Sequence, residues 1–331
     1  MSSLSEDPKD LNRADAPGEV FIRAEAYRNW GRWGEDDVLG TLNFIDEAKR
    51  VHAARLVTEG LSVSLAQSFD EDGPQRGWKK RNNPVHTMTG TGLDHERDPD
   101  ANPHGIGGAD DVIMMPLQCS TQWDGLGHIF DRGLAYNGRP AGAVVTTRGD
   151  LVTGIEHAAG VILSRGVLLD MGRHLRPDTG ELEDGYAITV DDLTACIEAQ
   201  GSSSQVARGD ILLVRTGQLA RARRDGWGEY AGGPAPGLSL TTAGWLHRSE
   251  IAAIATDTWG FEVRPNEFDE SFQPLHQIVI PNMGLTVGEM WDLEEIGRLC
   301  AARGRYEFLL SAPPLPITGA VGSPINPIAL L

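Results

Sequence analysis

Residues 118–128 read QCSTQWDGLGH, and this stretch carries the strongest chemical signal in the chain. It follows the apolar run Val112 to Leu117, which predicts a short buried strand. If the backbone stays extended past that run, alternate side chains project to one face. The side chains that would share this face are Gln118, Ser120, Gln122 and Asp124.

Two glycines then favour a sharp turn, because Gly125 and Gly127 tolerate backbone angles that other residues avoid. The turn would bring His128 back over the polar face. Amide oxygens, a carboxylate and an imidazole would converge there, and such a group can bind a metal ion or move a proton. The spacing leaves a structural alternative open, in which Asp124 caps a turn and His128 is a hydrogen-bonded core residue.

Around this stretch, strand and helix patterns alternate. Residues 61–65 alternate apolar and polar side chains and predict a half-buried strand. Helices are predicted from Asp46 to Thr58, from the capping-box residue Thr189 to Gln200, and from Glu294 to Ala302. Further strands are predicted at Val167–Met171, Ile211–Arg215, Ile251–Thr256, Tyr306–Leu310 and Ile325–Leu331. Alternation of this kind favours an α/β architecture with at least partly parallel strands.

One long segment, Phe69 to Asp110, lacks apolar periodicity and is rich in Gly, Pro, Asn, Asp and Arg. Loops of this length in compact domains are often lids or binding loops. The segment contains His86, His95 and His104, each of which either contacts a ligand or is a solvated loop residue.

Composition limits the possible functions. The 331 residues are 40% apolar, enough for a large core, and carry a formal net charge of −18, which disfavours nucleic-acid binding. Three widely spaced cysteines indicate neither a disulfide framework nor a thiolate zinc site. No apolar run is long enough to span a membrane, and the acidic start does not resemble a signal peptide, so we expect a cytoplasmic protein. We expect a disordered or arm-like segment over residues 1–29 and one catalytic domain over residues 30–331.

The motif resembles that of the cyclase family, which includes bacterial kynurenine formamidases and isatin hydrolase. The family signature runs His-x-Gly-Thr-His-x-Asp-x-Pro-x-His, and Thr121, Asp124 and His128 match it. Gln118 and Gln122 stand where the family has metal-binding histidines. This Gln-x-x-x-Gln-Trp-Asp-Gly-x-x-His version looks like the branch containing trans-dienelactone hydrolase.

Segments outside the motif extend the resemblance from about Trp30 to the C-terminus. They are residues 32–43, 209–217, 254–258 and 275–289, the last holding the family's downstream His and Glu at His276 and Glu289. The resemblance implies a swivelling β/β/α fold, homodimers or homotetramers, and one divalent metal, with zinc expected first and manganese second. It implies the ligands Gln118, Gln122, Asp124 and His276, with His128 as general base and Glu289 as a further ligand or water-orienting group.

The expected activity is hydrolysis of a lactone, or of a cyclic or N-acyl amide, in a small-molecule substrate. Replacing imidazole by amide ligands should weaken metal binding and reduce its dependence on pH, because amides carry no titratable proton. Two alternatives remain: a metal-dependent lyase or cyclase-dehydratase acting on a polyketide-like or sugar-acid substrate, and a non-catalytic small-molecule binding protein.

Overall fold

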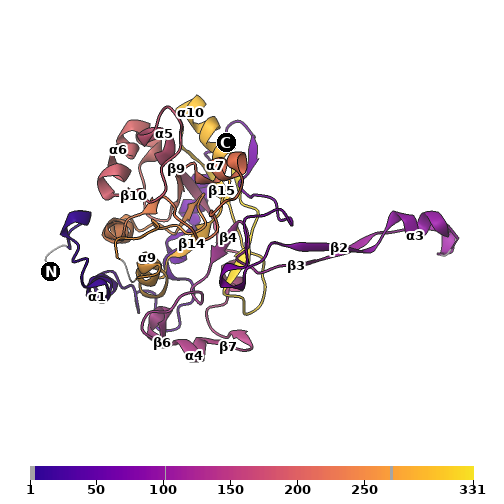
Figure 1. Ribbon diagram of the computed structural model, residues 1–331, viewed down its shortest axis with the longest axis horizontal. Coiled ribbons are helices and arrows are strands. Elements are labelled where there is room, and N and C mark those ends of the chain that lie inside the picture. Colours follow the sequence, from indigo (N-terminus) through magenta and orange to yellow (C-terminus); the bar gives the residue numbers. More distant parts are fainter. Residues whose placement is uncertain (1–3, 101, 269–270) are drawn as a thin grey trace.

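A nine-stranded mixed sheet forms the centre of the molecule (Figure 1). The computed structural model describes residues 4–100, 102–268 and 271–331. In spatial order the strands are β1 (Ser62–Ser64), β17 (Ile328–Leu330), β15 (Glu307–Ser311), β9 (Leu163–Asp170), β11 (Ile211–Arg215), β13 (Ala253–Thr256), β14 (Thr286–Glu289), β4 (Gln122–Asp124) and β16 (Gly322–Pro324). The four strands from β9 to β14 run parallel, and antiparallel strands flank them on both sides. The predicted α/β architecture is confirmed.

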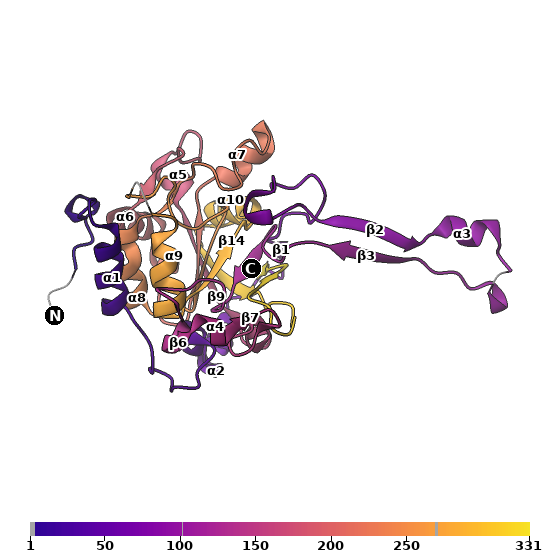
Figure 2. The same ribbon diagram turned by 60° about the horizontal axis from the view of Figure 1, so that its bottom comes forward.

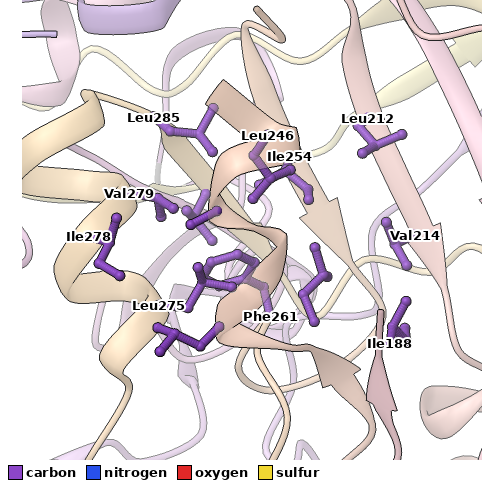
Figure 3. Close-up of a cluster of buried hydrophobic side chains, with 14 of the residues drawn as sticks. Ile188, Leu212, Val214, Leu246, Ile254, Phe261, Leu275, Ile278, Val279 and Leu285 are labelled. Carbon is purple, nitrogen blue, oxygen red and sulfur yellow. The ribbon is translucent and has the colours of Figure 1, made fainter. Parts of the chain in front are cut away.

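Helices cover both faces of the central strands, which explains why these strands are apolar throughout. In β11, Leu212 and Val214 belong to one buried cluster, and Ile211 and Leu213 belong to the cluster on the opposite face. Buried parallel strands have such continuous apolar runs because neither face meets water. The first cluster is shown in Figure 3, where Leu275 of α9 (Pro274–Ile278) lies beside Phe261.

The helices that contribute to the first cluster are α1 (Ala16–Ala26), α5 (Met171–Leu175), α6 (Val190–Gln200), α8 (Ala243–Ser249) and α9. Helix α10 (Glu294–Arg303) contributes to the second, and α2 (Glu47–Ala54) packs against β9. Further helices are α4 (Ala141–Val144) and α7 (Gln218–Asp225). Small ribbons pair β5 (Leu134–Ala135) with β6 (Arg139–Pro140), β7 (Val145–Thr146) with β8 (Gly149–Asp150), and β10 (Ala187–Ile188) with β12 (Gly237–Leu238).

Local sequence signals placed several elements correctly. Asp46 caps α2 by accepting from the Lys49 amide, and Thr189 forms a capping box with Asp192 at the start of α6. Gly201 follows α6 and Gly304 follows α10, as predicted. The N-terminal segment that we expected to be disordered or arm-like contains α1, which packs against α9; residues 1–3 of that segment lie outside the described residues.

One strand prediction was wrong. Val112–Leu117 is not a buried strand; instead β3 (Asp110–Met114) is exposed along its whole length and pairs with β2 (Val85–Gly90). Together with α3 (Gly92–Arg97) these two strands form an arm that stands away from the rest of the chain, as Figures 1 and 2 show. The apolar residues of β3 satisfy strand propensity without being covered by this chain, so an apolar run alone could not reveal their exposure.

Among the described residues, no helix has both the length and the apolar character needed to cross a membrane.

Candidate metal centre

Three ionisable side chains converge beneath α9, where β14 meets β4. Ligand atoms of Asp124, His276 and Glu289 all lie within 4.8 Å of one another, and all three residues are buried. Gln122 pairs with Glu289 in the antiparallel register of β4 and β14, and Asp124 lies two residues further along β4, so the three side chains share a face of the sheet. Helix α9 brings His276 to this face.

Gln122 joins the group through its side-chain amide. Its Nε2 donates to Glu289 Oε2 at 3.0 Å and to Asp124 Oδ1 at 3.2 Å. Its Oε1 is buried and has no hydrogen-bond partner. A buried acceptor without a partner is costly, and a half-turn of the amide would direct this oxygen toward the two carboxylates. A cation among them would make that orientation favourable.

His276 is held by a second carboxylate, that of Glu262. Glu262 accepts hydrogen bonds from the backbone amides of Leu275 and His276, each at 2.9 Å. These amides belong to the first turn of α9, where backbone N–H groups have no partner within the helix. The same carboxylate lies 2.5 Å from His276 Nδ1, while His276 Nε2 lies 3.0 Å from Glu289 Oε1. A carboxylate on the distal nitrogen of a metal-binding histidine fixes its tautomer and orientation.

Burial and neighbouring charge perturb the acids and bases of this centre. Burial raises the pKa of Asp124, and Glu289 adds to that effect while His128 opposes it. Burial acts to lower the pKa of His276, but its hydrogen bonds to Glu262 and Glu289 outweigh burial and raise that pKa to about 9. Two buried carboxylates with one imidazole between them form a site suited to a cation.

His128 lies at the edge of this group. Its Nε2 is 3.7 Å from Asp124 Oδ1 and 3.5 Å from Arg81 Nη2. Burial lowers the pKa of His128, and Arg81 lowers it further while Asp124 opposes the shift. The imidazole is therefore neutral near pH 7 and able to accept a proton.

Gln118 occupies a different position from the other motif residues. Residues 116–119 form a turn closed by the Cys119 amide on the Pro116 carbonyl at 3.2 Å, and a bend over 119–121 follows before β4, so the extended backbone expected there is wrong. The Gln118 side chain is half-buried, with its amide nitrogen against Gly322 of β16. Because Gly322 pairs directly with Asp124, this amide lies over the same face of the sheet. Ser120 is buried and donates weakly to the Ser68 carbonyl at 3.4 Å.

The segment before the arm forms a wall beside the centre. Lys79 Nζ donates to Gln273 Oε1 at 3.3 Å, and Gln273 Nε2 is 3.3 Å from His276 Nε2. Trp78 packs edge-on against Trp259, with ring centroids 4.8 Å apart, and the Arg81 guanidinium lies over Trp259. The predicted loop thus supplies residues 78–81 to the site.

Other residues singled out in the sequence make structural contacts or lie away from the centre. Asp257 accepts from the Thr216 amide and hydroxyl and from the Gly217 amide, and so caps the turn after β11. His86 lies on the arm and pairs with Asp111, while His95 hydrogen bonds to the Gly108 carbonyl. Trp123 is fully buried on the opposite face from the centre, in the second core cluster.

Sequence reasoning missed Glu262, Arg81, Lys79 and Gln273. Glu262 precedes His276 by fourteen residues across a loop, and no spacing rule connects them. The run Lys79-Lys80-Arg81 gave a weak signal, since clustered cations in an acidic chain are uncommon, but nothing in it indicates which side chain is buried.

Comparison with known proteins shows the family to which this chain belongs. The family model described as "Putative cyclase" matches residues 49–263. A crystal structure described as a novel cyclase is 40% identical, covers 93% of this chain and 99% of its own, and superposes with a TM-score of 0.83. The chain belongs to the cyclase family.

More distant structures share the fold. Isatin hydrolase A from Ralstonia solanacearum is 15% identical, with 81% of this chain and 91% of that chain covered and a TM-score of 0.59. Isatin hydrolase A from Labrenzia aggregata, bound to benzyl benzoate, is 16% identical, with 84% and 94% covered and a TM-score of 0.57. A search of curated proteins found no match.

Proposed function

We propose that this chain is a metal-dependent hydrolase that opens a lactone, or a cyclic or N-acyl amide, with Asp124, His276 and Glu289 as metal ligands. The observation that carries the proposal is the burial of these ligand atoms within 4.8 Å of one another, beside the unpartnered Gln122 Oε1. Two structures that share the fold are named isatin hydrolases, and this supports hydrolysis as the reaction. The trans-dienelactone branch, suggested by the motif, makes lactones the first substrates to test.

The donor set fits a divalent ion. Two carboxylates, one imidazole and one amide oxygen suit manganese as well as zinc, because both ions accept oxygen and imidazole ligands. When bound, the ion would act as a Lewis acid that polarises a carbonyl and lowers the pKa of water. Gln118, above the same face, stays a predicted ligand.

His128 is the proposed proton carrier. Its lowered pKa leaves it neutral, so it can accept a proton from the attacking water and later return it to the leaving oxygen or nitrogen. Its position 3.7 Å from Asp124 puts it next to the ligands without making it one of the three converging groups.

Turnover in oxygen-18 water tests the proposal. Manganese- or zinc-loaded protein is assayed against a panel of lactones, isatin-like rings and formamides. We expect ring opening or amide cleavage, with one solvent oxygen in the new carboxylate. A product formed by elimination, without solvent label, would instead support a lyase or dehydratase. Ligand binding that changes in Asp124→Ala, with no turnover of any panel member, would support a binding protein.

A further inference from the structure

We propose that the arm formed by β2, α3 and β3 is the contact surface for a second copy of this chain. Nearly all described residues between Val85 and Met114 are exposed, including large apolar side chains: Met114 is 72% exposed and Ile106 70%. Contiguous exposed apolar surface of this kind is typical of an interaction site.

The strand register puts apolar residues on both faces of the ribbon. Val85 pairs with Met114 and Thr87 with Val112, so these four share one face. His86 pairs with Ile113 on the other face, which also carries Met88. A lone two-stranded ribbon is marginally stable in water, and here neither face is covered by the chain itself (Figure 2).

The number of residues in the arm and the presence of the same chain as a possible partner favour a second copy. The described arm residues match the roughly 20–30 residues that each partner contributes to a standard interface, and a symmetric pair would use two arms. A copy of the same chain is present whenever the arm is made. Because residues 78–81 lead directly into the arm, the contact would also fix the wall beside the metal centre.

Sedimentation equilibrium of the full chain at micromolar concentration tests the arm. We expect wild type to form dimers or larger closed assemblies, and Val112→Lys combined with Met114→Lys to weaken assembly at least about tenfold, which corresponds to about 1.4 kcal/mol. The matched control is Val51→Lys, at an exposed position on α2, which should assemble as wild type does. Circular dichroism confirms that each variant is folded. A monomeric wild type, or a folded double variant that assembles like wild type, would overturn the proposal.

A separate observation concerns Arg81, and this second inference rests on the proposed function. Arg81 is 8% exposed, and its Nη1 is buried with no hydrogen-bond partner. Within the described residues it forms no ion pair, although its Nη2 lies 3.5 Å from His128. A buried guanidinium group without a carboxylate is costly unless an anion binds it.

We infer that Arg81 is a catalytic residue that binds the negative charge formed during hydrolysis. Water adds to the carbonyl carbon and gives a proton to His128, while the carbonyl electron pair moves to the carbonyl oxygen. When that pair re-forms the C=O bond, the bond from the carbonyl carbon to the leaving oxygen or nitrogen breaks, and the leaving atom takes the proton from His128. The acid that remains loses its own proton to water, so the former carbonyl oxygen becomes part of a carboxylate. Arg81 would donate hydrogen bonds to that oxygen beside His128, where the proton is transferred. Donors preorganised for a developing oxyanion act mainly on the chemical step.

Kinetics and binding test this role separately. We expect Arg81→Gln to lower kcat by about 100-fold or more with little change in KM, and Arg81→Lys to recover part of the loss. The control is Arg223→Gln, which removes an exposed partner of Asp292 and should behave as wild type. If wild type hydrolyses nothing, the proposed function fails, but binding of 2-furoate and of neutral 2-furamide to the manganese-loaded protein still tests Arg81. We expect Arg81→Gln to weaken furoate binding only. Equal effects on both probes, or an unchanged kcat, would overturn the assignment.

Discussion

At the scale of single residues, the centre depends on side chains that are positioned by others. Asp124 and Glu289 come from adjacent strands, but His276 is oriented by Glu262, which also caps α9. Without Glu262, the imidazole would lose its partner on Nδ1 and the helix start would lose its acceptor. Glu262 therefore matters for metal binding although it lies outside the ligand cluster.

Replacing Glu262 should weaken metal binding. Glu262→Gln keeps the size of the side chain but removes the charge that holds the His276 tautomer. Loss of such a partner typically lowers metal affinity about 10–100-fold. Calorimetric titration with manganese measures the effect, with Glu307→Gln, which removes a carboxylate paired with Arg165 away from the centre, as control. Wild-type affinity in folded Glu262→Gln would show that Glu262 does not orient the ligand.

The pKa of His276 makes metal binding pH-dependent. Because that pKa is raised from 6.5 to about 9, the protonated imidazole stabilises the folded metal-free chain below pH 6.5, and this stabilisation is lost as pH rises through about 9. A metal ion needs the neutral ring and must displace the proton. Manganese affinity should therefore rise by up to about tenfold per pH unit between pH 7 and 9. A flat profile would instead agree with the weak dependence expected from the amide ligands alone.

At the scale of elements, the helices and central strands follow directly from their sequences. The central strands are continuous apolar runs and the helices between them begin at capping residues. Strand and helix propensity, capping and burial therefore all predict the same elements. The motif strand was harder to predict because β4 is only three residues long, and a turn over 116–119 rather than an extended segment leads into it. The arm could not be predicted, because an apolar strand that is exposed in its own chain has the same pattern as a buried one.

The capping box of α6 gives a test at this scale. Thr189→Ala removes the hydroxyl that accepts from the Asp192 amide at 3.2 Å. We expect a loss of about 0.5–2 kcal/mol in the free energy of unfolding, measured by urea titration. Thr194→Ala, on the exposed side of the same helix, is the control. A loss no larger than that of the control would mean that the cap contributes little.

At the scale of the whole molecule, the sequence identified side chains that meet at one place in the fold, but not the contacts that hold them there. Asp124, His128, His276 and Glu289 were identified from the motif and its resemblance, and the structure brings them together. Glu262, Arg81 and Gln273 were missed because tertiary packing alone brings them to the centre from loops. Loop positions carry no periodic signal from which such proximity can be inferred.

Metal binding should stabilise the entire fold, since the ligands come from β4, α9 and β14. At a free metal concentration about 100 times Kd, the gain is about 2.7 kcal/mol. Thermal unfolding with and without a chelator measures it, and we expect a clear drop in Tm for wild type when metal is removed. Asp124→Asn should show no such drop. An equal response in wild type and variant would place the stabilising ion elsewhere.

Anomalous diffraction from crystals of the full chain soaked in manganese would locate the bound ion. We expect one strong peak within about 2.0–2.6 Å of carboxylate oxygens of Asp124 and Glu289 and of His276 Nε2. A well-ordered crystal with no peak between these side chains, or with its peak at another site, would contradict this expectation.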